Sequence, residues 1–161
     1  MNDLLIWSLK NARKQTLSLI EDLSDEQMRL QSATGENPPI WILGHLLLGD
    51  TYLLHLLNVS ELNADFTELL SKYGPQSTNR NFDSKQFLVK RLTETNLLRC
   101  EAVRRMNDLN KPMPDETLAK TQATIAHHLQ MLVFHEGNHC GQLSSWRKLQ
   151  GLSAVKGIFA S

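Results

Sequence analysis

The sequence predicts an all-α protein whose helices pack as a four-helix bundle. Apolar residues recur at helical spacing over four long segments, and no segment alternates apolar and polar residues between hairpin turns. The length of 161 residues is also close to the usual size of one domain. Four long amphipathic helices in one such domain usually bury their apolar faces against each other as a bundle. Residues 1–161 are therefore expected to form a single domain, and the lengths of the connections leave the topology open.

The first helix is expected from about Leu4 to Leu23. Leucine and isoleucine recur there at helical spacing, and lysine, arginine and glutamate are spread over the remaining surface. Ser24, followed three residues later by Gln27, has the pattern of a capping box and predicts a short extra turn. A glycine and two prolines then break the periodicity, so residues 31–37 are expected to form a loop.

The second helix is expected to begin at Pro38 and Pro39. Proline suits a first helical turn, because the N–H group that it lacks would have no intrahelical partner there. This helix should run to about Asn58. A shorter helix is expected over residues 61–72, and the glycine-, proline- and serine-containing stretch 73–81 has the composition of a linker.

The third helix is expected to take Asp83 as its N-cap, with Gln86 at the capping-box position, and to extend to about Asn107. A segment with two prolines then ends it. The last helix is expected over residues 121–150, and Gly151 follows it as a C′ residue.

The charge balance and the cysteines indicate where the protein is found and what it does not bind. Lysine plus arginine and aspartate plus glutamate each number 17, so no net charge attracts nucleic acid or an anionic membrane surface. No apolar run approaches the roughly 20 residues of a membrane-spanning helix, and the first residues lack the layout of a signal peptide. Cys100 and Cys140 are isolated and are expected to be reduced thiols. A cytoplasmic protein with no nucleic-acid or membrane partner is expected.

The last predicted helix contains two histidines at metal-chelating spacing. His135 and His139 are four residues apart, so their imidazoles share one helix face. Residues 135–139, with the sequence HEGNH, also match the HExxH pattern of zinc metalloproteases, in which the glutamate is the general base. Those proteases take their third ligand from downstream, but residues 140–161 contain no histidine, aspartate or glutamate. The metalloprotease interpretation therefore fails, and a third ligand must come from upstream.

His45 is the best-placed third ligand. It follows Trp41 by one turn on the apolar stripe of the second helix, so its imidazole should face the core. Three protein ligands and one open position are common in catalytic zinc sites. Taken singly, a histidine on such a stripe is more often a core residue, and a pair four residues apart is more often solvated or packed. A shared ion, however, removes the cost of burying several imidazoles without a partner.

The other histidines are expected outside the metal site. His128 shares a face with His135 but lies seven residues away, about 10.5 Å along the axis, and is better placed to line a pocket. His55 and His127 point about 80° off the apolar stripes and should be partly exposed. Several residues could line a substrate pocket or simply belong to the core: Trp41, Tyr52, Met131 and Trp146 as apolar walls, and His128 and Gln142 as polar groups.

Two stretches resemble the signature segments of the DinB-like (YfiT-like) superfamily. They are residues 38–46, with the sequence PPIWILGHL, and residues 134–143, with the sequence FHEGNHCGQL. The order and lengths of the helices between them are similar too, so the resemblance covers nearly the whole chain. It implies a four-helix bundle with one long crossover connection and a divalent metal ion, often zinc or nickel, on three histidines. By position these are His45, His135 and His139, the residues already selected by spacing.

The resemblance implies several functions rather than one. Similar proteins include metal-dependent hydrolases and enzymes that transfer or use low-molecular-weight thiols such as bacillithiol or mycothiol. The leading hypothesis is therefore a metal-dependent enzyme, a hydrolase or a thiol S-transferase, that acts on a small-molecule substrate. At an open coordination position the metal would lower the pKa of a bound water or substrate thiol. The alternative is a non-catalytic, stress-related protein that binds a metal or another ligand.

Glu136 and the oligomeric state carry further expectations. Glu136 lies about 100° around the helix from His135, so it is expected either to orient a metal ligand or to face solvent.

Helix bundles of this size often associate through an apolar face, and closed two-fold dimers are the commonest oligomers. A homodimer is therefore expected.

Overall fold

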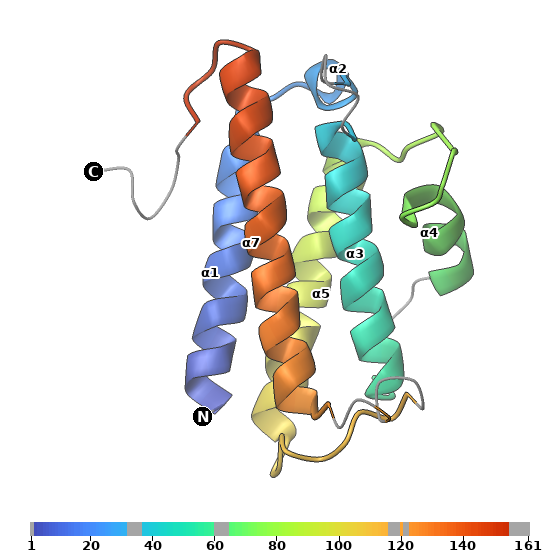
Figure 1. The fold of residues 1–161 in the computed structure, drawn as a ribbon, viewed down its shortest axis with the longest axis vertical. Helices are drawn as coiled ribbons and strands as arrows, with labels where there is room; N and C mark the ends of the chain where they lie inside the picture. The colour runs from blue at the N-terminus through green and yellow to red at the C-terminus, as the bar shows by residue number, and fades with distance from the viewer. Residues whose placement is uncertain (1, 32–36, 60–64, 116–119, 121–122, 155–161) are drawn as a thin grey trace.

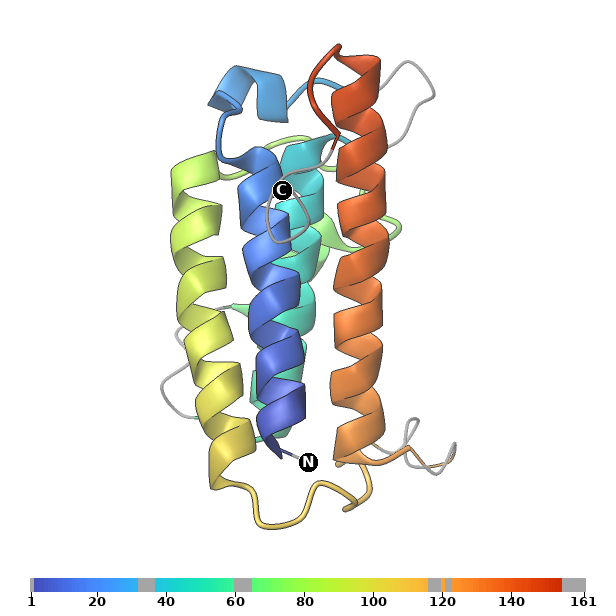
Figure 2. The same ribbon diagram turned by 90° about the vertical axis from the view of Figure 1, so that its left-hand side faces the viewer.

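The computed structural model describes residues 2–31, 37–59, 65–115, 120 and 123–154. Four long helices lie side by side (Figures 1 and 2): α1 (Asn2–Ile20), α3 (Pro39–Leu56), α5 (Lys85–Arg105) and α7 (Ile125–Leu149). The shorter helices α2 (Asp25–Met28) and α4 (Phe66–Tyr73) lie in the connections. The described residues form no strand, and their one isolated bridge joins Pro112 to Thr124. The all-α prediction is confirmed.

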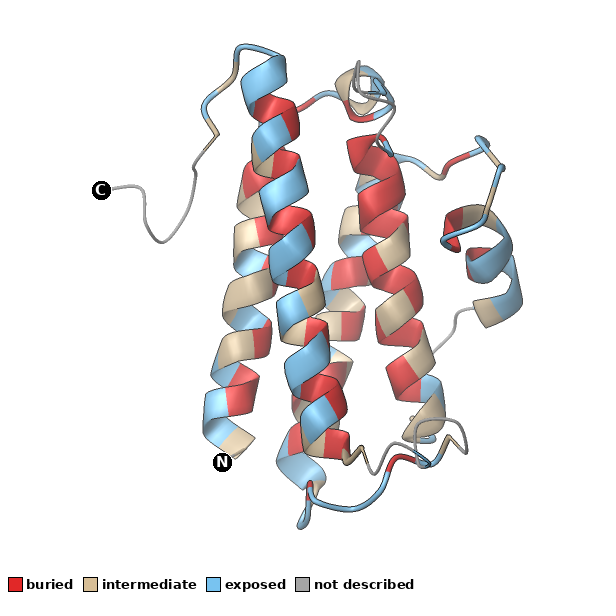
Figure 3. Ribbon diagram, in the orientation of Figure 1, coloured by how far each residue is buried: buried red, intermediate tan, exposed pale blue. Residues whose placement is uncertain are grey.

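The long helices do not simply alternate in direction. α1 and α7 run one way along the bundle, and α3 and α5 run the other way (Figure 1). Because α3 and α5 are parallel, the chain between them must return along the bundle, and this crossover carries α4. α4 packs on the outer side of α3, which is buried along most of its length (Figure 3). None of the described helices is both long and apolar enough to span a membrane.

Capping boxes, in which side chains bind free backbone N–H groups, fix the starts of two of the described helices. Ser24 and Gln27 form the predicted capping box at α2. Thr124 and His127 form a second one at α7, which was not predicted. At the far end of α7, the predicted C′ residue Gly151 has a φ of 72°, in the left-handed region that glycine adopts without steric cost.

The start of α5 corrects a prediction. Its N-cap is Ser84, whose hydroxyl accepts a hydrogen bond from the N–H of Phe87. The predicted N-cap, Asp83, instead accepts a hydrogen bond of 2.8 Å from the hydroxyl of Tyr73 and pairs with the ammonium of Lys72. These partners lie at the end of α4, so Asp83 ties the crossover together rather than capping a helix.

Other helix ends differ from prediction by a few residues. α1 ends at Ile20 rather than Leu23, and α4 begins at Phe66, after its N-cap Asp65. Residues 60–64, where the short helix was expected to start, lie outside the described residues, as do most residues of the loop predicted at 31–37.

The buried apolar residues form two clusters, one at each end of the bundle. The cluster nearer α2 includes Leu19, Leu43, Leu47, Leu92 and Leu143. The cluster nearer the start of α1 includes Leu9, Leu53, Val103, Leu129 and Leu132. In each long helix, a buried charged residue lies between the members of the two clusters. The core is therefore apolar at both ends and charged in the middle.

The four charged residues form one ionic network, which we call the polar layer: Arg13 of α1, Asp50 of α3, Arg99 of α5 and Glu136 of α7. Each is at most 2% exposed. Arg13 donates to both carboxylates, through Nε to Glu136 at 2.6 Å and through Nη1 and Nη2 to Asp50 at 3.1 Å. Arg99 also donates to Asp50 and lies 3.7 Å from Glu136. Two positive and two negative charges balance, so each buried charge has opposite charges beside it.

Removing one carboxylate should test how far stability depends on the polar layer. We expect Asp50→Ala to lower the free energy of unfolding by roughly 3–5 kcal/mol, because Arg13 and Arg99 would keep buried charges without their shared partner. Glu21→Ala, at an exposed carboxylate, should change it by no more than about 0.5 kcal/mol. Denaturant unfolding of both variants measures the difference, and similar midpoints for the two would contradict the expectation.

Candidate metal site

Two helices bring the three predicted histidines together. His45 comes from α3, and His135 and His139 come from α7. One ring nitrogen of each lies within 4.8 Å of the others. The Nε2 atoms of His135 and His139 are 3.1 Å apart. Two nitrogens bound tetrahedrally to zinc at 2.0–2.1 Å would be roughly 3.3 Å apart, so the observed spacing suits one shared ion.

His45 is held by contacts on its face and at its edge. Its ring stacks on Trp41, with centroids 4.5 Å apart and planes 11° from parallel. Its Nδ1 lies 2.9 Å from the backbone carbonyl oxygen of Tyr73. A carbonyl can only accept, so Nδ1 carries the hydrogen and the Nε2 lone pair is available to a metal. This carbonyl comes from the end of α4, so the crossover orients a ligand on α3.

His139 is oriented from within its own helix. Its Nδ1 lies 2.7 Å from Oε1 of Gln142, three residues later. The amide oxygen accepts the Nδ1 hydrogen, which again leaves Nε2 as the free nitrogen. Gln142 was predicted either to line a substrate pocket or to belong to the core; in the structure it holds a candidate metal ligand.

Burial keeps the three imidazoles in the form that binds metal. Desolvation lowers the pKa of His45 and of His135, and it lowers the pKa of His139 to about 4. All three are therefore neutral near pH 7, as metal coordination requires. His45 and His135 are only partly buried, so the site is accessible from the surface.

Glu136 does not face solvent, which was one of the two alternatives predicted for it. It is 1% exposed, and it turns into the polar layer rather than toward solvent. Its Oε1 accepts hydrogen bonds from Arg13 and, at 2.9 Å, from the hydroxyl of Thr16 on α1. Both groups lie on the α1 side of α7, so the carboxylate is not free to act on a group at the histidines.

Cys140, next to His139, is also outside the site. Its thiol lies 3.3 Å from the hydroxyl of Thr16, in the same direction as Glu136. Burial raises the pKa of this thiol to about 11, so it is protonated at neutral pH and a poor metal ligand. The donor set is therefore three nitrogens, with no sulfur.

The remaining residues named from the sequence fall into separate groups. His55 and His127, predicted to be partly exposed, are exposed. Trp146 is a core residue, and its ring N–H donates to the carbonyl of Leu30. His128 is buried beside Tyr52, with ring centroids 6.1 Å apart, and it is not part of the histidine cluster.

Gly44 shows why this region needs a glycine. A Cβ atom at this position would lie 2.1 Å from the Tyr73 ring, far inside contact distance. Tyr73 therefore packs directly on the backbone of α3, one residue before His45. Its hydroxyl is held by Asp83, so the ring cannot readily move aside. The sequence contains Gly44, but only the packing of α4 reveals its role.

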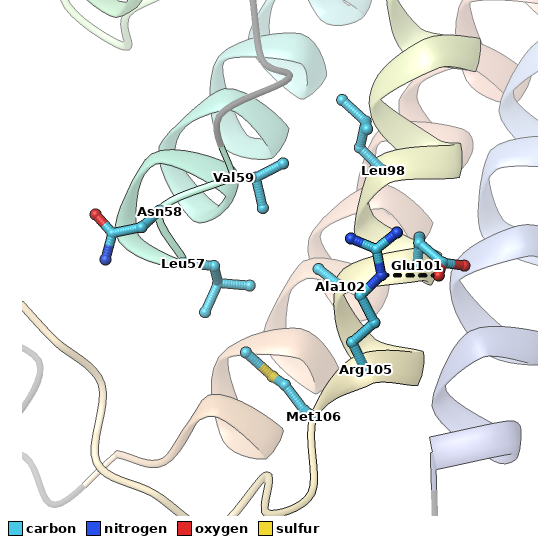
Figure 4. A pocket seen from close by; sticks show the side chains of 8 residues that line it. All are labelled: Leu57, Asn58, Val59, Leu98, Glu101, Ala102, Arg105 and Met106. Atoms are coloured by element: carbon cyan, nitrogen blue, oxygen red, sulfur yellow. Dashed lines mark hydrogen bonds and ion pairs between the residues drawn. The ribbon is translucent and has the colours of Figure 1, made fainter.

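A cavity elsewhere on the bundle is not connected with these histidines. It has a volume of about 370 Å³ and lies between the C-terminal ends of α3 and α5 (Figure 4). Its walls are mainly aliphatic, with the ion pair of Glu101 and Arg105 on one side. It contains no histidine, so it is a poorer candidate for metal chemistry than the three-histidine cluster.

Comparison with known families gives one match. A family model described as the DinB superfamily matches residues 8–143, a range that includes all three histidines. A comparison with curated proteins finds no match.

Gly44→Ala should weaken metal binding without touching a ligand. The added methyl group would displace Tyr73, so His45 would lose the carbonyl that orients it, and loss of such a partner typically costs 10–100-fold in affinity. Competition with a chromophoric chelator measures the affinity. Gly49→Ala is the matched control on the same helix, since its Cβ would meet only an ordinary contact of 3.7 Å. Equal affinities for the two variants would contradict the proposed role of Tyr73.

The metal-free protein should lose stability as the pH falls. His139 has a pKa of about 4 when folded and an ordinary pKa of about 6.5 when unfolded. Its contribution is therefore fully present above pH 6.5 and is lost toward pH 4, because only the unfolded chain takes up the proton readily. This histidine alone accounts for up to about 3 kcal/mol. Urea unfolding with chelator present should show a shallower pH dependence for His139→Gln, whereas His55→Gln should follow the parent protein.

Proposed function

This chain belongs to the DinB superfamily, and from that membership and the geometry of its histidines we propose that it is a metal-dependent enzyme. His45, His135 and His139 hold one divalent ion, zinc or nickel. The enzyme is a hydrolase or a low-molecular-weight-thiol S-transferase that acts on a small-molecule substrate. Neutral imidazoles suit both metals, and the absence of a thiolate ligand agrees with the burial of Cys140.

The proposal rests chiefly on the number of protein ligands, which is three. The cluster contains three histidines and, among the described residues, no fourth histidine, cysteine, aspartate or glutamate joins it. A sealed storage site would normally supply a fourth protein ligand, whereas a catalytic site keeps a position open. At that position a divalent ion supplies a positive charge that lowers the pKa of a bound water or thiol.

The position of Glu136 favours thiol chemistry over the metalloprotease type of hydrolysis. In HExxH proteases the glutamate takes a proton from the attacking water. Here that carboxylate is occupied by Arg13 and Thr16. A thiol with a pKa near 8.5 needs much less assistance to ionise than water with a pKa of 15.7. A divalent ion on three histidines can lower the pKa of a bound water to about 7, so water is also a candidate nucleophile, but a thiol is the nucleophile that depends least on a neighbouring base.

Two further features complete the proposal. The protein is cytoplasmic, where the buried free thiols of Cys100 and Cys140 would remain reduced. It forms a homodimer, and the exposed Trp7 and Phe134, at 61% and 68%, are apolar side chains of the kind that a partner would cover.

The experiment combines metal analysis with an activity panel. We expect the purified protein to hold about one equivalent of a divalent transition ion, because three nitrogens on rigid helices form a preorganised site. His45→Ala and His139→Ala should lose most of the metal, while His55→Ala should keep it. The loaded protein should conjugate low-molecular-weight thiols to electrophiles or hydrolyse esters or amides, and His45→Ala should abolish either activity.

The outcomes separate enzyme from binding protein. Full metal content in His135→Ala and His139→Ala would show that the site is elsewhere. A loaded protein that is inactive in both panels, with no exchangeable water on its metal, would instead indicate a non-catalytic binding protein.

A further inference from the structure

The polar layer is connected to both helices that carry the histidines. Glu136 directly follows His135, and Asp50 lies five residues after His45 on α3. Five residues correspond to roughly 7.5 Å along the axis and 140° around it. Each carboxylate therefore points into the bundle interior while the histidine beside it points toward the gap between α3 and α7. Because each carboxylate and its histidine are on one rigid helix, hydrogen bonds that fix the position of the carboxylate around the helix axis also fix that of the histidine.

Each of these carboxylates is held from several directions. Glu136 accepts from Arg13 at 2.6 Å and 3.3 Å and from Thr16 at 2.9 Å. Asp50 accepts from both guanidinium groups of the layer and, at 2.6 Å, from the hydroxyl of Thr95. Bidentate, charge-assisted bonds of this kind tolerate little change in angle.

A metal site depends strongly on helix rotation. The tip of a side chain lies roughly 5–6 Å from the helix axis, so a turn of about 20° moves it by roughly 2 Å. Metal–ligand distances tolerate only about ±0.2 Å. Apolar burial is non-directional, so it constrains the rotation of a helix less tightly than charge-assisted hydrogen bonds do. The charged layer supplies the missing angular constraint on α3 and α7.

We infer that the polar layer is a positioning device for the metal site, and that Asp50 and Glu136 are positioning residues that set the rotation of α3 and α7 so that the three histidines converge. This inference rests on the proposed metal site. It assigns Glu136 a role that differs from that of the glutamate in HExxH proteases: here it orients the helix instead of taking a proton.

The test uses Co²⁺ alone as the probe, because its visible absorption reports coordination geometry as well as binding. Glu136→Gln and Asp50→Asn keep side-chain shape and remove one charge. Both should bind Co²⁺ about 10-fold or more weakly, with an altered spectrum, at temperatures where circular dichroism shows them folded. If either fails to fold, Thr16→Val and Thr95→Val remove one hydrogen bond from each carboxylate and should weaken binding in the same direction.

Arg147→Gln is the matched control for lost stability. Arg147 is also a buried arginine of α7, 1% exposed. It donates to Asp22, to the carbonyl of Leu19 near the C-terminal end of α1 and to the carbonyl of Ser153, and none of these hydrogen bonds involves α3. Its replacement should lower the melting temperature and leave the Co²⁺ affinity and spectrum unchanged.

The results distinguish the inference from the proposed function. If the unaltered protein fails to bind Co²⁺, or if His135→Ala binds it equally well, the proposed metal site is wrong. If the unaltered protein binds and the folded variants of Asp50 and Glu136 keep its affinity and spectrum, the positioning role is wrong. An equal loss of affinity in Arg147→Gln would also overturn it, because the effect would then follow stability alone.

Discussion

The buried pairing of Arg13 and Arg99 with Asp50 and Glu136 is the interaction on which the rest of this bundle depends. One charge comes from each long helix, and the four lie between two apolar clusters. A buried charge cannot slide along an apolar groove to a new partner without losing several hydrogen bonds at once. Apolar side chains supply most of the burial, and the polar layer selects one register and one rotation for all four helices. This division of tasks resembles that of a single polar position in a coiled coil, which fixes register at a cost in stability.

The candidate metal site is built at the same level of the bundle but on a different face of α7. His135 and Glu136 are neighbours in sequence, yet one imidazole faces α3 and the carboxylate faces α1. Because the polar layer is neutral overall, it places no net charge beside the histidines. Three neutral imidazoles add none either, so a bound ion would keep its full charge for an anionic partner. The crossover also contributes to the candidate metal site, since the carbonyl of Tyr73 fixes the tautomer of His45.

Most of the fold and the three histidines could be predicted from the sequence, and the reasons are physical. Helical spacing is a local signal, and His135 and His139 meet within one helix, so no tertiary information is needed for them. His45 could be selected because the downstream sequence offers no alternative ligand. Glu136 and Tyr73 could not be placed in this way. Their roles depend on which helix lies opposite and on how the crossover folds back over Gly44, and a single sequence contains neither relation.

The comparison with HExxH proteases shows how little a short motif says about mechanism. In both cases two histidines share a helix face and a glutamate lies between them, and the geometry of a helix ensures that the glutamate points away from the midpoint of the pair. What the glutamate does then depends on its surroundings. A neighbouring helix with two donors, here Arg13 and Thr16, converts a potential base into a structural anchor. Any chemistry of the proposed metal site would therefore proceed without that base and would use a nucleophile that a divalent ion can ionise unaided, either a bound water or, with the least demand on the ion, a thiol.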